Sequence, residues 1–476
     1  DTQFVDLSSL VGNESVLVAF HYYDDGEWLF GWAIDDVLVF QPEGLDLAMG
    51  SLNTSENINV QDPTLVSGVV NNNGAEVITS FDLTWMLNGN SFTTNFSGLS
   101  IAPLGSYTFS HPDLLELMSS GTYELTVTIS NVNGMGDNDS SNDSISMEVQ
   151  ALEYGTILDG GFQREYIYYH AASAPENCPL VFVCHGYTGT AQNIMDYSEF
   201  NSIAEENGFA VCYPQGIEDS FGNTFFNVGY DFQNGETVDD VAYLQHLVEH
   251  LQGSYSLTEE DIFCTGLSNG GDFCYLLACE ASETFKGVAP VAGMILQEIM
   301  NNCASANEVS IFEIHGTQDN VTYFEGDPEN NDDWGAYPSI PATIAFFEEL
   351  YNLEEQNNEN LPNIDPQDGS TVVADKFSNE DSCTQVWLYT IIGGGHDWPG
   401  AWGNMDISAS EEVWSFFEQL CDNEVGIHHD ELYEYDPNRT LIKIVDSMGR
   451  EIKEQNNKVM FFWYSDGSVE RKLIVE

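Results

Sequence analysis

Basic residues are scarce in this chain of 476 residues. It contains 10 Lys and Arg residues against 78 Asp and Glu residues, which gives a formal net charge of −68 at pH 7. A surface this acidic repels phosphate groups, so the composition excludes nucleic-acid binding through a basic face and binding to anionic membranes. Such a surface also repels itself. Because dissolved ions screen that repulsion, the composition fits a soluble protein that works in a saline habitat.

Long apolar runs and closely spaced cysteines are also missing. No run approaches the ~18 apolar residues that a membrane-spanning helix needs, so we predict no membrane span. The first residues lack the basic region that opens a signal peptide, and none is expected in the sequence given. The nine cysteines lie between Cys178 and Cys421 without C-x-C or C-x-x-C spacing. Zinc is therefore not expected, and we predict neither a metal nor another cofactor.

The few basic residues are unevenly distributed, and this divides the chain. Residues 1–150 contain no Lys or Arg, residues 151–423 contain three, and residues 424–476 contain the other seven. The change in charge predicts a domain boundary near residue 424. About three domains are expected for a chain of this length.

The first 150 residues carry the patterns of short strands. Alternating runs such as "TSFDLTWMLNG" and "TYELTVTISNV", separated by Asn, Gly and Ser turns, predict a β-sandwich over residues 44–150. This region resembles Ig-like adhesion modules. Residues 1–43 are too few for a complete domain and resemble the closing strands of a β jelly-roll module. The stretch from Gly136 to Ser144 has the chemistry of a calcium loop, although a solvated turn is the favoured interpretation.

Residues 151–423 change to an alternation of strands and helices. The apolar runs "CPLVFVCHG", "GFAVCYPQG", "DIFCTGLS", "GVAPVAG" and "VSIFEIHGT" are separated by helical patterns. Such alternation indicates βαβ units, so we predict an α/β domain with a mostly parallel sheet and flanking helices.

One pentamer in this region has the pattern of a nucleophile elbow. Ser268 lies between Gly266 and Gly270, after a predicted strand and before a predicted helix. In a tight strand-to-helix turn the two glycines avoid Cβ clashes, and the serine hydroxyl projects over the carboxyl ends of the strands. The sequence therefore predicts that Ser268 is a nucleophile.

The partners that a serine nucleophile needs follow later in the chain. Asp319 lies in the loop after "IFEIHG", and His396 lies in the Gly-rich loop after "VWLYTII". The order Ser, Asp, His is that of the α/β-hydrolase fold, with His396 as the base and Asp319 as the group that orients it. Asp240 in "VDDVAYL" is the rival acid, although its position before the serine favours a structural role.

Further residues are assigned from their positions beside these motifs in the sequence. We predict that the backbone N–H groups of Tyr187 and Asn269 form the oxyanion hole. Trp398 follows His396 by two residues and is expected to bind substrate with its indole face. His185 and His315 each open an H-G turn and are expected to hold neighbouring loops. Cys279 and Cys303 flank the segment after the elbow, and we expect a disulfide between them if the protein is secreted.

Seven motifs of residues 155–420 resemble the polyhydroxybutyrate depolymerase and feruloyl esterase group of serine esterases. They are "HGYTGT", "YPQG", "VDDVAYL", "GLSNGG…ACE", "VAPVAG", "HGTQDNVTYFEG" and "GGGHDWPG". The resemblance implies the α/β-hydrolase fold, an acyl-enzyme intermediate and the triad Ser268, Asp319 and His396. It also implies a polymeric or oligomeric ester as substrate, either a polyester or a feruloyl polysaccharide. The alternatives are an acetylxylan-type esterase, and an adhesion or carbohydrate-binding surface protein with an inactive hydrolase domain.

The last part of the chain resembles a different family. "LIKIVDSMGREI" and "KVMFFWYSDGSVERKLIVE" within residues 424–476 are similar to the C-terminal sorting domain of type IX secretion in Bacteroidetes, a small β-sandwich. This resemblance implies export by that machinery, and a secreted or surface-attached protein.

Overall fold

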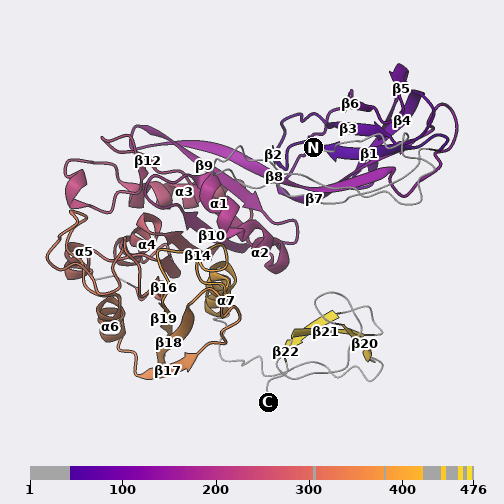
Figure 1. Cartoon of the computed structure of the whole chain (residues 1–476). Coiled ribbons are helices and arrows are strands. Elements are labelled where there is room, and N and C mark those ends of the chain that lie inside the picture. The colour runs from indigo at the N-terminus through magenta and orange to yellow at the C-terminus, as the bar shows by residue number, and fades with distance from the viewer. Residues whose placement is uncertain are drawn as a thin grey trace, which may run out of the picture. The chain divides into compact units, whose positions relative to one another are not determined.

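The structure, a computed structural model, describes residues 43–303, 307–379, 382–421, 441–445, 459–464 and 469–473 (Figure 1). It forms two compact units, Asp1–Cys421 and Asp422–Glu476. The division between them lies beside the boundary predicted near residue 424. The predicted jelly-roll remnant, residues 1–43, falls outside the described residues except for Glu43.

Two sheets enclose one core in residues 43–152, here called the N-terminal β region. One has the order β1-β3-β6, and the other contains β8-β7-β4-β5, with β2 paired to β8. Side chains alternate between buried and exposed along β4, as one covered face requires: Phe81, Leu83 and Trp85 are buried. The bounds are β1 (Leu47–Leu52), β2 (Asn57–Asn59), β3 (Ser67–Asn72), β4 (Ile78–Leu87), β5 (Asn90–Ile101), β6 (Ser106–Ser110) and β7 (Gly121–Ser130).

The long strand β8 (Ser144–Asp159) belongs to both regions of the first unit. Its first half pairs with β7 from Ser144 to Ala151, and its second half pairs with β9 (Phe162–His170) from Glu153 to Asp159. The domain boundary predicted at residues 150 and 151 therefore falls inside a strand, and one sheet continues from the N-terminal β region into the region that follows.

Six strands of the following region run parallel, in the order β11-β10-β14-β15-β16-β19. Antiparallel strands flank them, β9 on one side and β18 and β17 on the other. The sheet is therefore mixed, with the predicted parallel strands at its centre and antiparallel strands on both sides. The bounds are β10 (Cys178–Cys184), β11 (Ala210–Pro214), β14 (Leu257–Leu267), β15 (Gly287–Val291), β16 (Ser310–Gly316), β17 (Glu355–Asn360), β18 (Thr371–Asn379) and β19 (Ser382–Ile392).

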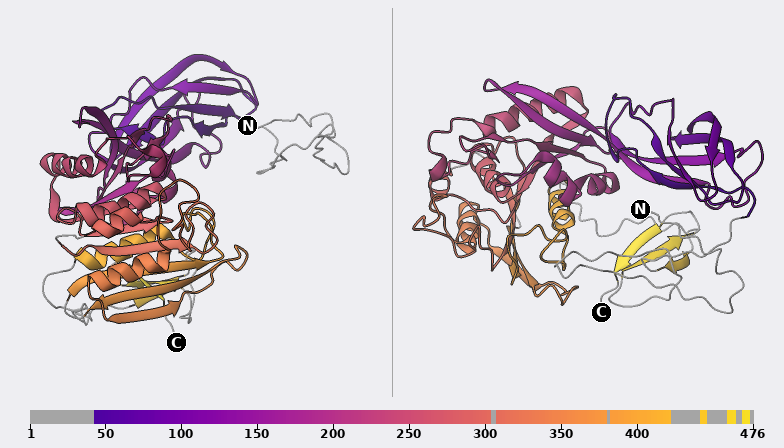
Figure 2. Two further views of the ribbon diagram at one scale, coloured as in Figure 1. Left: turned by 90° about the vertical axis from the view of Figure 1, so that its left-hand side faces the viewer. Right: turned by 45° about the horizontal axis from the view of Figure 1, so that its top comes forward.

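Helices cover both faces of the parallel strands (Figure 2). One hydrophobic cluster contains residues of α3 (Asp240–Ser254), α4 (Asn269–Glu280) and α6 (Ile340–Leu350). The other contains residues of α1 (Ala191–Ser198), α2 (Phe200–Asn207) and α7 (Ala409–Cys421). Strands covered on both faces read as continuous apolar runs, which is why β10 and β15 could be recognised in the sequence.

The second unit contains one described sheet. β20 (Leu441–Val445), β21 (Val459–Tyr464) and β22 (Val469–Leu473) pair antiparallel in that order. The identification of this unit as a sorting domain stays a prediction. Within the described residues, no helix is both long and apolar enough to span a bilayer.

Candidate active site

Ser268 occupies a strained turn between β14 and α4. Its φ of 55° and ψ of −120° lie outside the regions that residues with a side chain prefer. A Cβ atom at Gly266 would lie 2.6 Å from the carbonyl carbon of Gly270, and one at Gly270 would lie 2.3 Å from the Cys184 oxygen. Both contacts are too short for any side chain, so glycine at these two positions is what lets the elbow form.

Asp319 and His396 meet at the carboxyl ends of neighbouring strands. Asp319 follows β16 and His396 follows β19, which pair in parallel, so their loops leave the same edge of the sheet. The Nδ1 atom of His396 lies 2.7 Å from Oδ2 of Asp319. The other oxygen, Oδ1, accepts hydrogen bonds from the backbone N–H groups of Val321 and Thr322 at 2.8 and 2.9 Å. Asp319 is therefore fixed at one oxygen and presents the other to the imidazole.

Close backbone contact holds these two loops together. A Cβ atom at Gly316 would lie 2.4 Å from the carbonyl oxygens of Gly394 and Gly395, so only glycine allows this approach. The Gln318 N–H donates to the Gly394 oxygen at 2.8 Å. The side chain of His396 remains 19% exposed, whereas that of Asp319 is fully buried. This difference leaves the imidazole accessible from outside while its acid partner is shielded.

The predicted oxyanion groups lie beside the nucleophile. A Cβ atom at Gly186 would lie 3.4 Å from Cβ and 4.0 Å from Oγ of Ser268, so the residue before Tyr187 lies against the elbow. Asn269 is the first residue of α4, where backbone N–H groups lack partners within the helix. Its side chain is engaged elsewhere, because it bonds both backbone groups of Phe226 and the hydroxyl of Tyr230. Its backbone N–H is thus the group that remains for the predicted role.

Asp240, the rival acid, is held elsewhere. One carboxylate oxygen lies 2.5 Å from Nη2 of Arg164, and the other accepts from the Asn227 N–H at 2.7 Å. Both side chains of the ion pair are fully buried. The Arg164 guanidinium also lies 3.7 Å from the centre of the Tyr243 ring. Burial raises the pKa of Asp240, although the charge of Arg164 opposes the shift. Asp240 is thus bound to Arg164, whereas Asp319 is bound to His396.

The prediction that Trp398 binds substrate is wrong. Its side chain is only 1% exposed and lies in the hydrophobic cluster of α1, α2 and α7. The ring packs edge-on against Tyr197 and Phe200, and its Nε1 donates to Ser410 Oγ at 3.1 Å. Proximity to His396 in sequence does not determine which way a side chain points, and the loop turns this indole into the core.

Aromatic rings from three separate segments gather next to Tyr187 instead. We call Tyr187, Phe221, Phe232 and Trp334 the aromatic surface. The ring centre of Tyr187 lies 5.8 Å from those of Phe232 and Trp334, and Phe221 is 65% exposed. The hydroxyl of Tyr187 donates to Asp219 at 2.7 Å, which fixes the ring. No local motif connects these residues, so no sequence pattern indicates that they come together.

His185 supports the loop that carries Tyr187. Its Nδ1 lies 2.8 Å from the Gly186 oxygen, and its Nε2 accepts the Gly216 N–H at 3.0 Å. Burial lowers the pKa of His185 to about 4, so the ring is neutral at pH 7 and can accept that hydrogen bond. This matches the loop-holding role expected for it.

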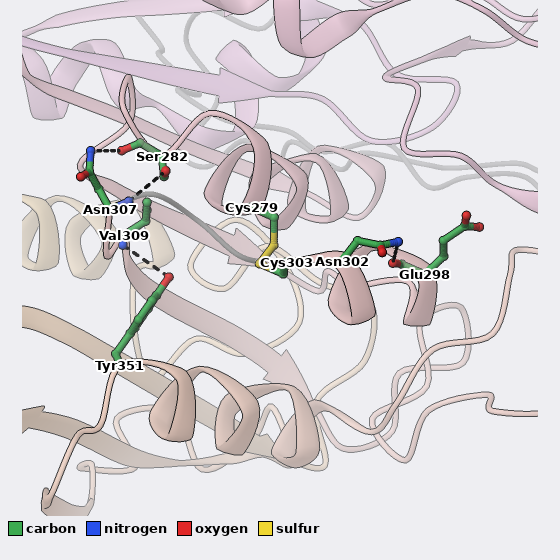
Figure 3. Close-up of a disulfide and its surroundings, with 8 residues drawn as sticks. All are labelled: Cys279, Ser282, Glu298, Asn302, Cys303, Asn307, Val309 and Tyr351. Carbon is green, nitrogen blue, oxygen red and sulfur yellow. Dashed lines mark hydrogen bonds between the residues drawn. A yellow bond between two sulfur atoms is a disulfide. The ribbon is translucent and has the colours of Figure 1, made fainter.

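A disulfide joins Cys279, at the end of α4, to Cys303, which follows α5 (Gln297–Asn302) (Figure 3). The bond closes a segment with a sequence separation of 24 residues. Within the described residues, no group of three His, Cys, Asp or Glu side chains is arranged to hold a metal ion.

Comparisons with known proteins identify the class of enzyme. Residues 164–361 match the family model described as Esterase PHB depolymerase. Feruloyl esterase D of Neurospora crassa is 31% identical over 202 residues, 41% of this chain and 59% of that protein. Feruloyl esterase C of Emericella nidulans is 24% identical over 245 residues, 50% of this chain and 77% of its own.

A bacterial relative and a solved structure complete the comparison. Poly(3-hydroxyalkanoate) depolymerase C of Paucimonas lemoignei is 28% identical over 157 residues, 32% of this chain and 36% of that protein. An acetyl xylan esterase structure from Aspergillus awamori aligns with 56% of this chain and 99% of its own, at 16% identity and a TM-score of 0.40. The family match and the sequence relatives show that the chain is a carboxylic ester hydrolase.

Proposed function

We propose that the protein cleaves esters through an acyl-enzyme intermediate formed on Ser268. The observation that carries this proposal is the hydrogen bond between His396 and Asp319 at the sheet edge onto which the Ser268 elbow opens. His396 takes the proton of the Ser268 hydroxyl as Oγ attacks the ester carbonyl carbon. Asp319 keeps the proton of the imidazole on Nδ1 and stabilises the imidazolium.

The attack produces a tetrahedral intermediate, which collapses to the acyl-enzyme, and water then hydrolyses the acyl-enzyme. The negative oxygen of the tetrahedral intermediate is stabilised by the N–H groups of Tyr187 and Asn269, assisted by the positive end of α4. His396 gives its proton to the leaving alcohol, which departs and leaves the acyl group on Ser268. Water, deprotonated by His396, attacks the acyl carbon; the bond to Ser268 Oγ then breaks, the serine oxygen takes the proton back from His396, and the carboxylic acid is released.

We propose a polymeric or oligomeric ester as the substrate. Relatives named feruloyl esterase and poly(3-hydroxyalkanoate) depolymerase support this class. The aromatic surface supports it as well, because rings that pack against Tyr187, a predicted oxyanion residue, offer apolar area to a bulky acyl group. We further propose that residues 424–476 direct export, so that the enzyme reaches a polymer outside the cell.

The test is covalent labelling of the nucleophile. A fluorophosphonate probe should label the parent protein, and Ser268→Ala should abolish both labelling and turnover of p-nitrophenyl acetate while the circular dichroism spectrum stays unchanged. Ser220→Ala, in an exposed turn, is the matched control and should label normally. Persistent labelling of the Ser268 variant would refute the proposed nucleophile, and a parent that neither labels nor turns over ester would favour an inactive adhesion protein.

A further inference from the structure

A second histidine lies behind the Asp319 carboxylate. His315, on β16, has its Nε2 atom 3.5 Å from Oδ2 of Asp319, the oxygen that contacts His396. Its Nδ1 atom lies 2.7 Å from Oε1 of Glu313. The side chains of Glu313, His315 and Asp319 are fully buried. A continuous row of four titratable groups therefore runs from Glu313 to His396.

The contacts of His315 determine where its protons lie. Nε2 is 2.9 Å from the carbonyl oxygen of Thr322, which can only accept, so Nε2 carries a proton. Nδ1 faces a carboxylate oxygen of Glu313 and shares a proton with it. Burial lowers the pKa of His315, but the hydrogen bond and charge of Glu313 and the charge of Asp319 outweigh that effect and raise it. The two carboxylates thus favour the positive form of the ring, while burial raises the pKa of Glu313 to about 7.

The other groups around this row carry little charge. Tyr275 of α4 donates to Oε2 of Glu313 at 3.0 Å. Asp272 of α4 accepts from the Met294 N–H at 2.6 Å and from the Tyr230 hydroxyl. Burial raises the pKa of Asp272 to about 8, so this group is mostly neutral at pH 7. The titratable groups that face His315 are therefore Glu313, Asp319 and, beyond Asp319, His396.

We propose that Glu313 and His315 are positioning residues that extend the Asp319–His396 pair. This inference rests on the proposed function, in which Asp319 orients His396. The imidazolium of His315 offsets part of the Asp319 charge, and the bond to Thr322 ties the ring to the loop that binds Oδ1 of Asp319. Glu313 acts through His315, because its carboxylate keeps that ring protonated in a buried site.

The charge of His315 has a consequence for the pH dependence of the reaction. Without it, the full Asp319 charge acts on His396 and attracts positive charge there more strongly. His315→Gln and Glu313→Gln should therefore both move the acid limb of the kcat/KM profile to higher pH, by about half a unit or more, since either change removes the imidazolium.

The size of the loss separates these residues from the triad. We expect kcat at optimal pH to fall about tenfold to a hundredfold, well short of the ~10⁴-fold loss caused by removing the acid of a serine triad. The double variant Glu313→Gln/His315→Gln should lose about as much as either single variant, because the two residues act as one unit.

The matched control is His111→Gln in the N-terminal β region. His111 is also buried, at 1% exposure, and it bonds the Trp85 indole. This variant should lower the melting temperature without moving the acid limb. If folded His315→Gln and Glu313→Gln variants keep the parent profile while Ser268→Ala is inactive, the positioning role is overturned and the proposed function stands. If Ser268→Ala keeps its activity, the proposed function itself has failed.

Discussion

Replacing the carboxylate by an amide should reduce the catalytic rate at Asp319 and the stability of the fold at Asp240. Both aspartates are buried, and each lies in a motif that a sequence comparison could assign to the triad acid. Asp319 binds His396, while Asp240 binds Arg164. Asn is nearly isosteric with Asp, so each substitution removes the charge and one acceptor with little change in volume. The pair of variants therefore separates catalysis from stability.

For Asp319→Asn the expected loss is in kcat. The amide must keep an oxygen toward the N–H groups of Val321 and Thr322, so its NH₂ group faces Nδ1 of His396. Two donors then oppose each other, and the ring adopts the tautomer whose other nitrogen cannot accept the serine proton. The corresponding change in a serine protease lowers kcat about 10⁴-fold, which is about 5 kcal/mol at 1.36 kcal/mol for each tenfold change.

For Asp240→Asn the expected loss is in stability. Arg164 would keep its charge in a site where its side chain is fully buried, with no other described carboxylate in an ion pair with it. Its Nε and Nη1 atoms already lack hydrogen-bond partners in the described structure, so Asp240 provides its principal compensation. Breaking a buried ion pair from one side costs about 3–5 kcal/mol.

Urea unfolding and steady-state kinetics on p-nitrophenyl acetate measure the two effects. Asp319→Asn should unfold within about 1.5 kcal/mol of the parent, and Asp240→Asn should keep kcat within about fivefold wherever it is folded. The reasoning is refuted if Asp240→Asn lowers kcat by three orders of magnitude in a folded protein. It is equally refuted if Asp319→Asn retains more than a tenth of the parent rate.

Three further predictions follow from other sites. Trp334→Ala should weaken kcat/KM on a feruloyl or hydroxybutyrate ester by the equivalent of about 1–3 kcal/mol, and on p-nitrophenyl acetate by less. Trp398→Phe should lower the melting temperature and leave the ratio of kcat/KM on the two esters unchanged. Equal losses on both esters for Trp334→Ala would contradict a role of the aromatic surface in substrate binding. Burial, followed by the charges of Asp137, Asp46 and Asp139, raises the pKa of Asp143 to about 6. The folded state therefore binds a proton more tightly than the unfolded chain, and Asp143→Asn should raise the melting temperature at pH 7, with a gain that disappears as the pH falls toward 4; no gain at pH 7 would count against the argument. Replacing both Cys279 and Cys303 by Ser should cost about 3 kcal/mol of unfolding free energy, as expected for a closed segment of 24 residues; an unchanged urea midpoint would show that the disulfide constrains nothing.

The sequence predicted the centre of the enzyme because its signals are local. Gly266 and Gly270 mark a turn that no other residues permit, and residues 262–267 of β14, which lead into it, are all buried. Asp319 and His396 each follow such a strand. Since the carboxyl ends of parallel strands share one edge, their order in the chain was enough to predict that they meet.

Features that depend on side-chain direction or on distant segments were not accessible in this way. Trp398 is two residues from His396 but points into the core, which only the packing of α1, α2 and α7 decides. The aromatic surface assembles from loops far apart in the chain, and each ring alone resembles an ordinary core residue. His315 was expected to hold a loop, and it does contact Thr322. Its contact with Asp319 required the three-dimensional path of the turn between them.

The strand β8 has a mechanical meaning as well as a structural one. Its pairing with β7 ends at Ala151 and its pairing with β9 begins at Glu153, so one continuous strand connects the two regions. Glu205 adds a second connection between the strands on either side of β8, since its Oε1 accepts from the Thr122 N–H of β7 at 3.0 Å and from the Tyr169 hydroxyl of β9 at 2.5 Å. Tension along the strand loads many hydrogen bonds in parallel, so they must break together instead of one at a time. A force on the N-terminal β region would therefore pass to the following region through β8, which is hydrogen-bonded in both, and not through a flexible linker.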